Sequence, residues 1–217
     1  MASTGTSMQV SAMAPNPQAF IHIVDDDRLV RESLGDLLRS MDYHVILYGS
    51  AAEFLDVALP EAPSCLVLDV RLPRVSGLEL QDYLNHVNIR LPVILMSGYG
   101  DVPMSVRAMK AGAIDFLVKP IRHQDLLDAV GAAIQKDLQR REAAMQAAEL
   151  RERYDLLTLR ERQVLALVVA GLLNKQIAHE LSISEVTVKM HRFSLMKKLQ
   201  AKSLAILVRM AKAIESS

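Results

Sequence analysis

Polar side chains follow four apolar runs of strand type in the first half of the sequence, where they could do chemistry together. They are Asp25, Asp26, Asp69, Ser97 and Lys119. Ligands of parallel α/β sheets bind at the carboxyl ends of the strands, so these side chains are expected to meet at one edge of a sheet. Carboxylates crowded in a crevice repel one another unless a cation sits among them or some are protonated. Because carboxylate oxygens are the ligands that a hard ion prefers, the sequence predicts a Mg²⁺ site at this edge.

Asp69 is the strongest candidate for a reacting group. It ends the apolar run at 65–68, and a Leu-Pro pair soon afterwards stops the strand. A carboxylate in such a pocket can attack a phosphoryl group and form an aspartyl phosphate. The Lys119 ammonium and the Ser97 hydroxyl are expected to take phosphoryl oxygens, and most of the catalysis would come from positioning and charge neutralisation.

Each of these polar residues also has an ordinary structural interpretation. Acidic residues after a strand often cap the next helix, and we expect Asp27 to do only that. A Lys-Pro pair such as 119–120 is commonly a turn. The functional interpretation therefore depends on the joint position of these residues at four strand ends.

The composition favours a cytoplasmic protein with well-packed cores. Of the 217 residues 51% are hydrophobic, yet there is no run of the ~18 apolar residues needed to span a membrane. No basic residue precedes Arg28 and no signal-type apolar block opens the chain, so secretion is not expected. The single cysteine, Cys65, excludes an internal disulfide, suits a reducing compartment and is expected to pack in a core. One Cys and scattered His give no support for a zinc site.

The net charge of zero hides an asymmetry between the two halves of the chain. Residues 20–135 hold 16 acidic and 10 basic side chains, a net charge of −6, whereas residues 136–217 hold 9 acidic and 15 basic, a net charge of +6. This asymmetry predicts two domains with different partners.

Alternating strand and helix patterns fill residues 19–135. The predicted strands are 20–24, 44–48, 65–68, 92–96 and 114–118. The predicted helices are 29–41, 50–59, 77–87, 102–111 and one that begins at 124. Such alternation predicts an α/β domain with a five-stranded, parallel, doubly wound sheet of the flavodoxin-like type, covered by helices on both faces. Residues 1–18 show no periodicity and are expected to form a flexible tail.

The remaining residues are helical by pattern. Residues 136–153 contain neither Gly nor Pro and predict a helical linker. Residues 154–217 predict an all-α domain of four helices with a helix-turn-helix arrangement. Thr158 and Glu161 form a capping box before the first of these helices.

The third helix of this domain, at 185–199, carries a basic face outside its core face. Helical spacing predicts that the core face consists of Val188, His191, Leu195 and Leu199. The residues outside this face are Lys189, Met190, Phe193 and Lys197. From 186 to 214 there are seven Lys or Arg residues and no Asp or Glu. A solvated amphipathic helix usually carries mixed charge, so this pattern predicts insertion into a DNA major groove, with phosphates held by flanking cations.

Short motifs of the first domain resemble those of two-component receiver domains. They are Val24-Asp25-Asp26, Leu68-Asp69, Pro73 with Ser76-Gly77, Ser97-Gly98 and Lys119-Pro120. The stretch 98–116 is similar to the FixJ-type subgroup in particular. This resemblance covers residues 20–135 and implies a response regulator.

The receiver resemblance also implies roles for single residues of the acidic pocket. Asp69 would be phosphorylated by a sensor histidine kinase. Asp26, Asp69 and the Arg71 carbonyl would ligate Mg²⁺, with Asp25 acting through water.

Two further features concern the response to phosphorylation. The resemblance implies that Ser97 and Phe116 are a switch pair, in which Ser97 turns toward the phosphoryl group and Phe116 packs inward behind it. Many receivers carry Asn or Met two residues after the phosphorylated Asp, whereas this chain carries Arg71. A long cation there could shield the phosphoryl group or point away from it.

The second domain resembles a LuxR-type helix-turn-helix. The resemblance rests on the stretches 157–165, 174–178 and 187–191 and on Gly171. It implies that 185–199 is the recognition helix of a DNA-binding domain.

Carried over residue by residue, the LuxR-type resemblance predicts individual DNA contacts. The residues that would face bases are Lys189, Met190 and Phe193. The residues that would hold phosphates are Lys175, Thr187 and Lys197, with Arg192 at the edge of the core face as a further phosphate contact. Many relatives carry a polar or small residue in place of Phe193, which could contact a thymine methyl group or pack on a neighbour.

Together these features predict a phosphorylation-dependent transcription regulator rather than an enzyme. Phosphorylation of Asp69 would change the face at 102–134, which would dimerise and place two recognition helices on a two-fold site in double-stranded DNA. Release of the basic domain from the receiver is a second effect, coupled to dimer formation, and the sequence does not rank the two. RNA polymerase is a further candidate partner, and no membrane partner is expected.

Two other functions stay open at the level of sequence. A Mg²⁺-dependent phosphohydrolase with an aspartyl-phosphate intermediate needs a second Asp as general acid near the nucleophile, and Arg71 at that spacing argues against it. A DNA-binding protein with a degenerate receiver would use that domain only to dimerise. The presence of every pocket residue argues against this second alternative.

Overall fold

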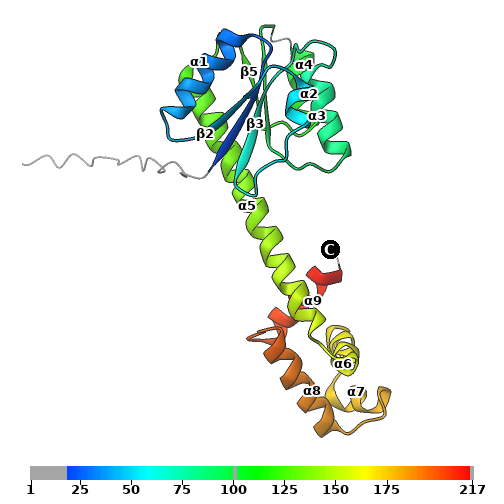
Figure 1. Cartoon of the computed structure of the whole chain (residues 1–217). Coiled ribbons are helices and arrows are strands. Elements are labelled where there is room, and N and C mark those ends of the chain that lie inside the picture. The colour runs from blue at the N-terminus through cyan, green and yellow to red at the C-terminus, as the bar shows by residue number, and fades with distance from the viewer. Residues whose placement is uncertain (1–18, 100–101, 216–217) are drawn as a thin grey trace, which may run out of the picture. The chain divides into compact units, whose positions relative to one another are not determined.

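The computed structural model describes residues 19–99 and 102–215, so the predicted tail at 1–18 and two residues of the FixJ-like stretch lie outside the described residues. The chain divides into two compact units, residues 1–139 and 140–217. Strands and helices alternate in the first unit, whereas the second is helical (Figure 1).

The described part of the first unit holds a single five-stranded sheet. Its strands are β1 (Phe20–Val24), β2 (His44–Tyr48), β3 (Ser64–Asp69), β4 (Val93–Ser97) and β5 (Asp115–Val118). Their order is β2-β1-β3-β4-β5, and each neighbouring pair is parallel. The strand order reverses at β1 and β3, so their carboxyl ends form a topological switch point. The predicted parallel, doubly wound α/β fold is confirmed.

Helices cover both faces of this sheet (Figure 1). They are α1 (Arg28–Arg39), α2 (Ala51–Leu55), α3 (Gly77–His86), α4 (Val102–Lys110) and the first turns of α5 (His123–Asp155). One core, which includes Leu38 and Ile134, lies beneath α1 and α5. The other, which includes Phe54 and Leu84, lies beneath α2, α3 and α4. Successive residues of the buried strand β3 alternate between the two cores, as the pleat of a strand requires.

Side-chain caps set where two of these helices begin. Asp27 caps α1 and Ser50 caps α2, both as predicted. The predicted helix at 50–59 is too long, because α2 ends at Leu55. The residues just after Leu55 are exposed, so a further helical turn would bury little, and the residue before Pro60 is biased away from helical conformation.

Helix α5 continues without a break to Asp155, through the residues predicted as a helical linker. Within α5, the fully buried Asp137 carboxylate accepts a hydrogen bond from the backbone N–H of Ser64 at 3.0 Å. Ser64 is the first residue of β3, so this bond fastens α5 to the strand that ends at Asp69.

Beyond α5, the described part of the second unit consists of four helices. They are α6 (Leu159–Val169), α7 (Asn174–Glu180), α8 (Glu185–Lys198) and α9 (Leu204–Glu215). Thr158 and Glu161 form the predicted capping box at α6, and Ser184 caps α8. The core of this unit includes Val164, Ile177, Val188, Leu195, Leu199 and Leu207. The predicted all-α domain of four helices is confirmed.

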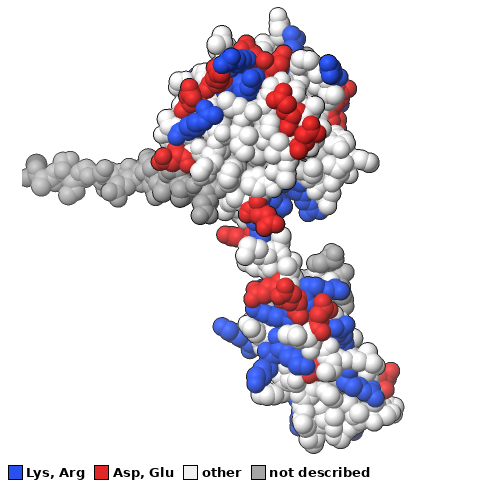
Figure 2. All heavy atoms as spheres, viewed as in Figure 1, with Lys and Arg blue, Asp and Glu red and all other residues white. Residues whose placement is uncertain are grey.

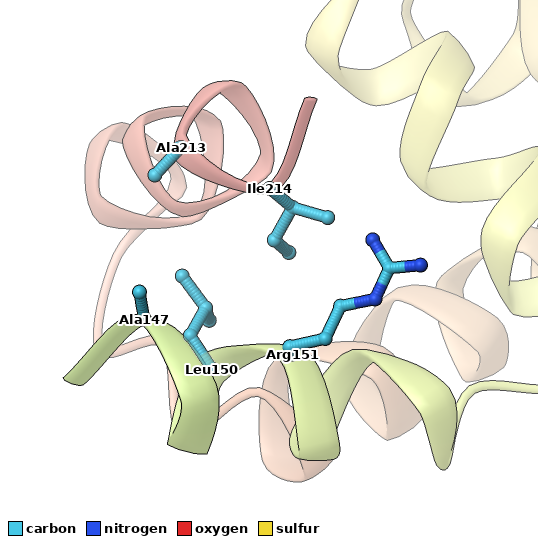
Figure 3. Close-up of a pocket in the computed structure, with 5 residues that line it drawn as sticks. All are labelled: Ala147, Leu150, Arg151, Ala213 and Ile214. Carbon is cyan, nitrogen blue, oxygen red and sulfur yellow. The ribbon is translucent and has the colours of Figure 1, made fainter. Parts of the chain in front are cut away.

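The last turns of α5 pack beside α9 and leave a pocket of about 330 Å³. Figure 3 shows Ala147, Leu150 and Arg151 of α5 facing Ala213 and Ile214 of α9. These lining residues are mainly apolar and include none of the predicted site residues. Among the described residues, no helix is both long and apolar enough to cross a membrane.

Candidate functional site

Three carboxylates gather at the carboxyl edge of the sheet. Asp25 and Asp26 follow β1, and Asp69 ends the adjacent strand β3. Within this pair of strands Val24 lies opposite Leu68, so both strands deliver their acids to the same place. One oxygen from each carboxylate lies within 4.8 Å of the others. Asp25 and Asp69 are 0% and 4% exposed whereas Asp26 is exposed, so the cluster is reachable from solvent.

Lys119, directly after β5, joins the two buried carboxylates. Its Nζ lies 2.7 Å from Asp25 Oδ2 and 3.0 Å from Asp69 Oδ1. Burial raises the pKa of the Asp25 carboxyl, although the Lys119 ammonium acts in the opposite direction. Burial alone would lower the pKa of the Lys119 ammonium, but its hydrogen bonds to the two carboxylates outweigh that effect and raise the pKa. The pocket therefore keeps a fixed positive charge beside Asp69.

The donor set of this pocket fits a magnesium ion. Its three carboxylates supply only oxygen ligands, which suit a hard cation. Mg²⁺ usually keeps several of its waters, and the exposure of Asp26 leaves room for them on the solvent side.

The backbone of Asp69 lies directly against Gly77, the first residue of α3. A Cβ atom placed on Gly77 would lie 2.3 Å from the Asp69 carbonyl oxygen. The Gly77 N–H also donates a hydrogen bond to the Val70 carbonyl at 2.9 Å. A residue with a side chain at this position would displace the backbone that carries the candidate nucleophile.

Ser97, at the end of β4, is buried and hydrogen-bonded within its own loop. Its Oγ donates to the Tyr99 carbonyl at 2.8 Å and accepts from the Tyr99 N–H at 3.2 Å. The Arg71 guanidinium lies over the Tyr99 ring, with Cζ 4.2 Å from the ring centroid. In this structure the cation two residues after Asp69 is therefore engaged by Tyr99.

Phe116 lies on β5 and is partly buried against the second core. The register of β4 and β5 pairs Leu95 with Phe116 and Ser97 with Val118. Since alternate residues of a strand share a face, Ser97 and Phe116 lie on the same face of the sheet. The structure thus places the two predicted switch residues diagonally across neighbouring strands.

Two residues that the sequence patterns do not single out also help to build the pocket. The Arg31 guanidinium, in the first turn of α1, donates to the Asp25 carbonyl. Tyr99 contacts both Ser97 and Arg71. For Tyr99 the sequence signal is an aromatic residue just beyond the end of a strand, whereas the sequence gives no signal of its own for Arg31.

The predicted base-contacting and phosphate-contacting residues lie mainly on the outside of α7 and α8. Those that are exposed are Lys175, Lys189, Met190, Phe193 and Lys197. Thr187 is partly buried, and its hydroxyl lies 2.8 Å from the Ser184 hydroxyl within the cap of α8. Figure 2 shows Lys and Arg side chains spread over the visible face of the second unit.

Buried contacts fix α8 on its two neighbouring helices. Arg192 donates to Asn174 Oδ1 at 2.7 Å, which ties α8 to α7. Lys198 and Ser194 donate to the buried Glu161 carboxylate at 2.7 and 2.6 Å, which ties α8 to α6. Burial alone would raise the pKa of Glu161, but these hydrogen bonds outweigh it and lower the pKa to about 2. Arg192 thus already has a partner inside the domain.

Family models match both units of the chain. Residues 21–131 match the response regulator receiver domain, and residues 155–211 match the bacterial regulatory proteins of the luxR family. The chain therefore belongs to the response regulators and carries a receiver followed by a LuxR-type DNA-binding domain.

Individual relatives are similar over nearly the whole chain. Nodulation protein W of Bradyrhizobium diazoefficiens is 50% identical over 91% of this chain and 87% of its own length. The transcriptional regulatory protein FixJ of Rhizobium meliloti is 45% identical over 89% of this chain and 95% of its own length. The solved structure of the response regulator StyR matches 90% of this chain and 98% of its own, with 47% identity and a TM-score of 0.79.

Proposed function

We propose that Asp69 is the phosphoacceptor of this receiver and that its phosphorylation controls DNA binding through α8. The observation that supports this most directly is the Lys119 ammonium, which contacts both Asp25 and Asp69. A nucleophile that must meet a polyanionic phosphoryl group needs positive charge held in place beforehand. The three clustered carboxylates supply the ligands for a second positive charge.

In the proposed reaction a carboxylate oxygen of Asp69 attacks the phosphorus of a phosphohistidine on a sensor histidine kinase. The oxygen–phosphorus bond forms as the phosphorus–nitrogen bond breaks, and the imidazole leaves with the electron pair. Asp26, Asp69 and the Arg71 carbonyl, with Asp25 acting through water, would hold a Mg²⁺ ion that supplies charge neutralisation at the phosphoryl oxygens. Lys119 then exchanges its contact with Asp69 for a phosphoryl oxygen.

Ser97 and Phe116 would carry the change out of the pocket. To reach a phosphoryl oxygen, the Ser97 hydroxyl must give up its hydrogen bonds with Tyr99. That movement frees space on the sheet face that Ser97 shares with Phe116, which packs inward. The face formed by α4, β5 and the first turns of α5, at 102–134, then favours a homodimer.

A homodimer would place two copies of α8 on a two-fold site in double-stranded DNA. On each copy Lys189, Met190 and Phe193 would meet bases, while Lys175, Thr187 and Lys197 would meet phosphates, with Arg192 at the edge of this surface. We propose that the protein works in the cytoplasm and that RNA polymerase is a further partner at the promoter.

We propose that the chain transfers one phosphoryl group to itself rather than turning over a phosphorylated substrate. A phosphohydrolase of this kind needs a second acid beside the nucleophile, and the position two residues on holds Arg71, whose guanidinium lies over Tyr99. Steady release of many phosphates per protein molecule would contradict this assignment.

Intact mass after treatment with a small acyl phosphate and Mg²⁺ tests the phosphoacceptor. Wild type should gain one phosphoryl group and Asp69→Asn none. Asp36→Asn, which changes an exposed carboxylate on α1, is the matched control and should still gain it. A gain of equal size in Asp69→Asn would overturn the assignment of Asp69.

A further inference from the structure

Three large apolar side chains form an exposed line along α8. Val186, Met190 and Phe193 are 66%, 67% and 73% exposed. Positions spaced by four and three residues lie above one another on a helix, so the three side chains make one strip. Lys197 continues the strip toward the C-terminal end of α8 and is also exposed.

The orientation of this strip is fixed by the opposite face of α8. Val188 and Leu195 on that face are fully buried in the core of the unit. The bonds from Arg192 to Asn174 and from Lys198 to Glu161 hold the helix against rotation. Phe193 is therefore largely exposed within the described part of this unit.

Most charged side chains around the strip are cationic, although the exposed Glu185 precedes Val186 at the start of α8. Lys189 and Lys197 lie beside it on α8, and Lys175 is exposed on α7. From 186 to 214 the sequence has no acidic residue. A shallow groove of about 410 Å³ next to the strip is lined by Phe193, Met196, Lys197, Gln200, Ala201 and Lys202. A second copy of α8 would bring like charges together here, whereas a polyanion would be attracted.

An occupant of this surface must combine phosphates with an apolar feature. In the DNA major groove the C5-methyl group of thymine is the apolar feature that a side chain can reach. Such a methyl group lies between the phosphates of the two strands. The strip has Lys189 beside it and Lys197 at its C-terminal end.

We propose that Val186, Met190 and Phe193 select the DNA site by contact with thymine methyl groups. This inference rests on the proposed function, because it requires that α8 enters the major groove. Beyond that proposed function, the inference states which base this surface prefers. At the positions under Phe193 and Met190, thymine should be favoured because of its methyl group rather than its hydrogen-bonding edge.

The test uses the full-length protein after treatment with acyl phosphate and Mg²⁺. Duplexes with a random core are first selected for binding, and the enriched site is then made with single thymines replaced by deoxyuridine. This replacement removes the methyl group and leaves base pairing unchanged. Losing one buried methyl group should weaken binding about fourfold at one or two positions of each half-site. Replacement of thymine at the other positions of the site should leave the affinity unchanged.

Variants identify the side chains responsible for this effect. Phe193→Ala should lose the sensitivity to the methyl group at the position under Phe193 and keep it at the position under Met190. Leu159→Ala is the matched control, because Leu159 is 73% exposed like Phe193 but lies at the start of α6. It should keep the full sensitivity to the methyl group.

Each outcome decides one of the two proposals. A selected site that wild type binds equally well with deoxyuridine at every thymine would overturn the methyl-reading strip and leave DNA binding intact. Retained methyl sensitivity in Phe193→Ala, Met190→Ala and Val186→Ala would overturn it as well. Failure to enrich any duplex would overturn the proposed function itself.

Discussion

The Arg71 guanidinium lies over the Tyr99 ring, with its Cζ 4.2 Å from the ring centroid. Arg71 stands two residues after Asp69, and Tyr99 stands two residues after Ser97. The contact therefore joins the loop that follows the candidate nucleophile at the end of β3 to the loop that follows the candidate switch hydroxyl at the end of β4. Because Ser97 is hydrogen-bonded to the Tyr99 backbone, movement of Ser97 should disturb this contact.

Removing the Tyr99 ring should lengthen the life of the phosphoryl group. Tyr99→Ala frees the Arg71 guanidinium to meet a phosphoryl oxygen and shield it from water. An exposed cation–π contact is worth ~0.5–1 kcal/mol, so the rate of phosphoryl loss should fall about two- to fivefold. Loss of acid-labile phosphate over time measures that rate.

Two further variants separate the ring from the cation. The double variant Arg71→Ala, Tyr99→Ala should lose its phosphoryl group at the wild-type rate, because it has no guanidinium at position 71 to shield that group. Arg74→Ala, a neighbouring exposed arginine, should leave the rate unchanged. The same slowing in the double variant would contradict a role for Arg71.

Lys119→Ala should impair phosphorylation. The variant removes the positive charge that contacts both Asp25 and Asp69. Loss of one preorganised charge at a reacting group should slow phosphoryl incorporation by about 100-fold. Intact mass as a function of time gives the rate, and Lys110→Ala on the surface of α4 serves as the control. Equal rates in the two variants would show that Lys119 is not used.

Two glycine-to-alanine substitutions should change stability in opposite directions. Gly77→Ala places a Cβ 2.3 Å from the Asp69 carbonyl oxygen, and such overpacking should lower the free energy of unfolding by about 1–3 kcal/mol. Gly131→Ala lies within α5 and meets nothing within 4 Å, so it should raise the free energy of unfolding by about 0.5–1 kcal/mol. Denaturant unfolding followed by circular dichroism measures both. A stable Gly77→Ala would show that the loop after β3 can shift.

The buried imidazole of His22 should make the receiver sensitive to acid. Burial lowers the pKa of His22 from 6.5 to about 4, and its Nδ1 lies 3.0 Å from the Tyr48 hydroxyl. Below pH 6.5 the unfolded chain gains a proton that the folded receiver does not. The free energy of unfolding should therefore be unaffected by His22 above pH 6.5 and should fall as the pH drops from 6.5 toward 4. The total decrease should be about 3 kcal/mol.

Substitution of the imidazole tests that source of acid sensitivity. His22→Phe should flatten the dependence of the free energy of unfolding on pH between 4 and 6.5. Tyr48→Phe keeps the imidazole and should retain the slope. An unchanged slope in His22→Phe would assign the acid sensitivity to other groups.

Much of the fold could be predicted from local patterns. The strands are apolar runs bounded by polar residues or prolines, and Asp27, Ser50 and Thr158 cap helices through contacts within three residues along the chain. Each of these contacts joins residues that lie close together in the sequence, so the local sequence is enough to predict them. The convergence of Asp25, Asp69 and Lys119 could also be predicted, because parallel strands bring their carboxyl ends to one edge.

Other features depend on contacts that no local pattern encodes. Asp137 looks like an ordinary charged residue of a long helix, yet it is fully buried because its carboxylate meets the N–H of Ser64. The contact of Arg71 with Tyr99 depends on how two loops lie beside each other. The hydrogen bond from Arg192 to Asn174 joins two helices, and no local pattern in the sequence indicates it.

The central claim is that phosphorylation of Asp69 controls DNA binding by α8. The most direct measurement is the Kd for a selected duplex before and after treatment with acyl phosphate and Mg²⁺, for wild type and Asp69→Asn. Couplings between two sites are typically 5- to 150-fold, so binding by wild type should tighten by about that much while Asp69→Asn stays unchanged. Equal tightening in Asp69→Asn, or none in wild type that has gained its phosphoryl group, would contradict the account.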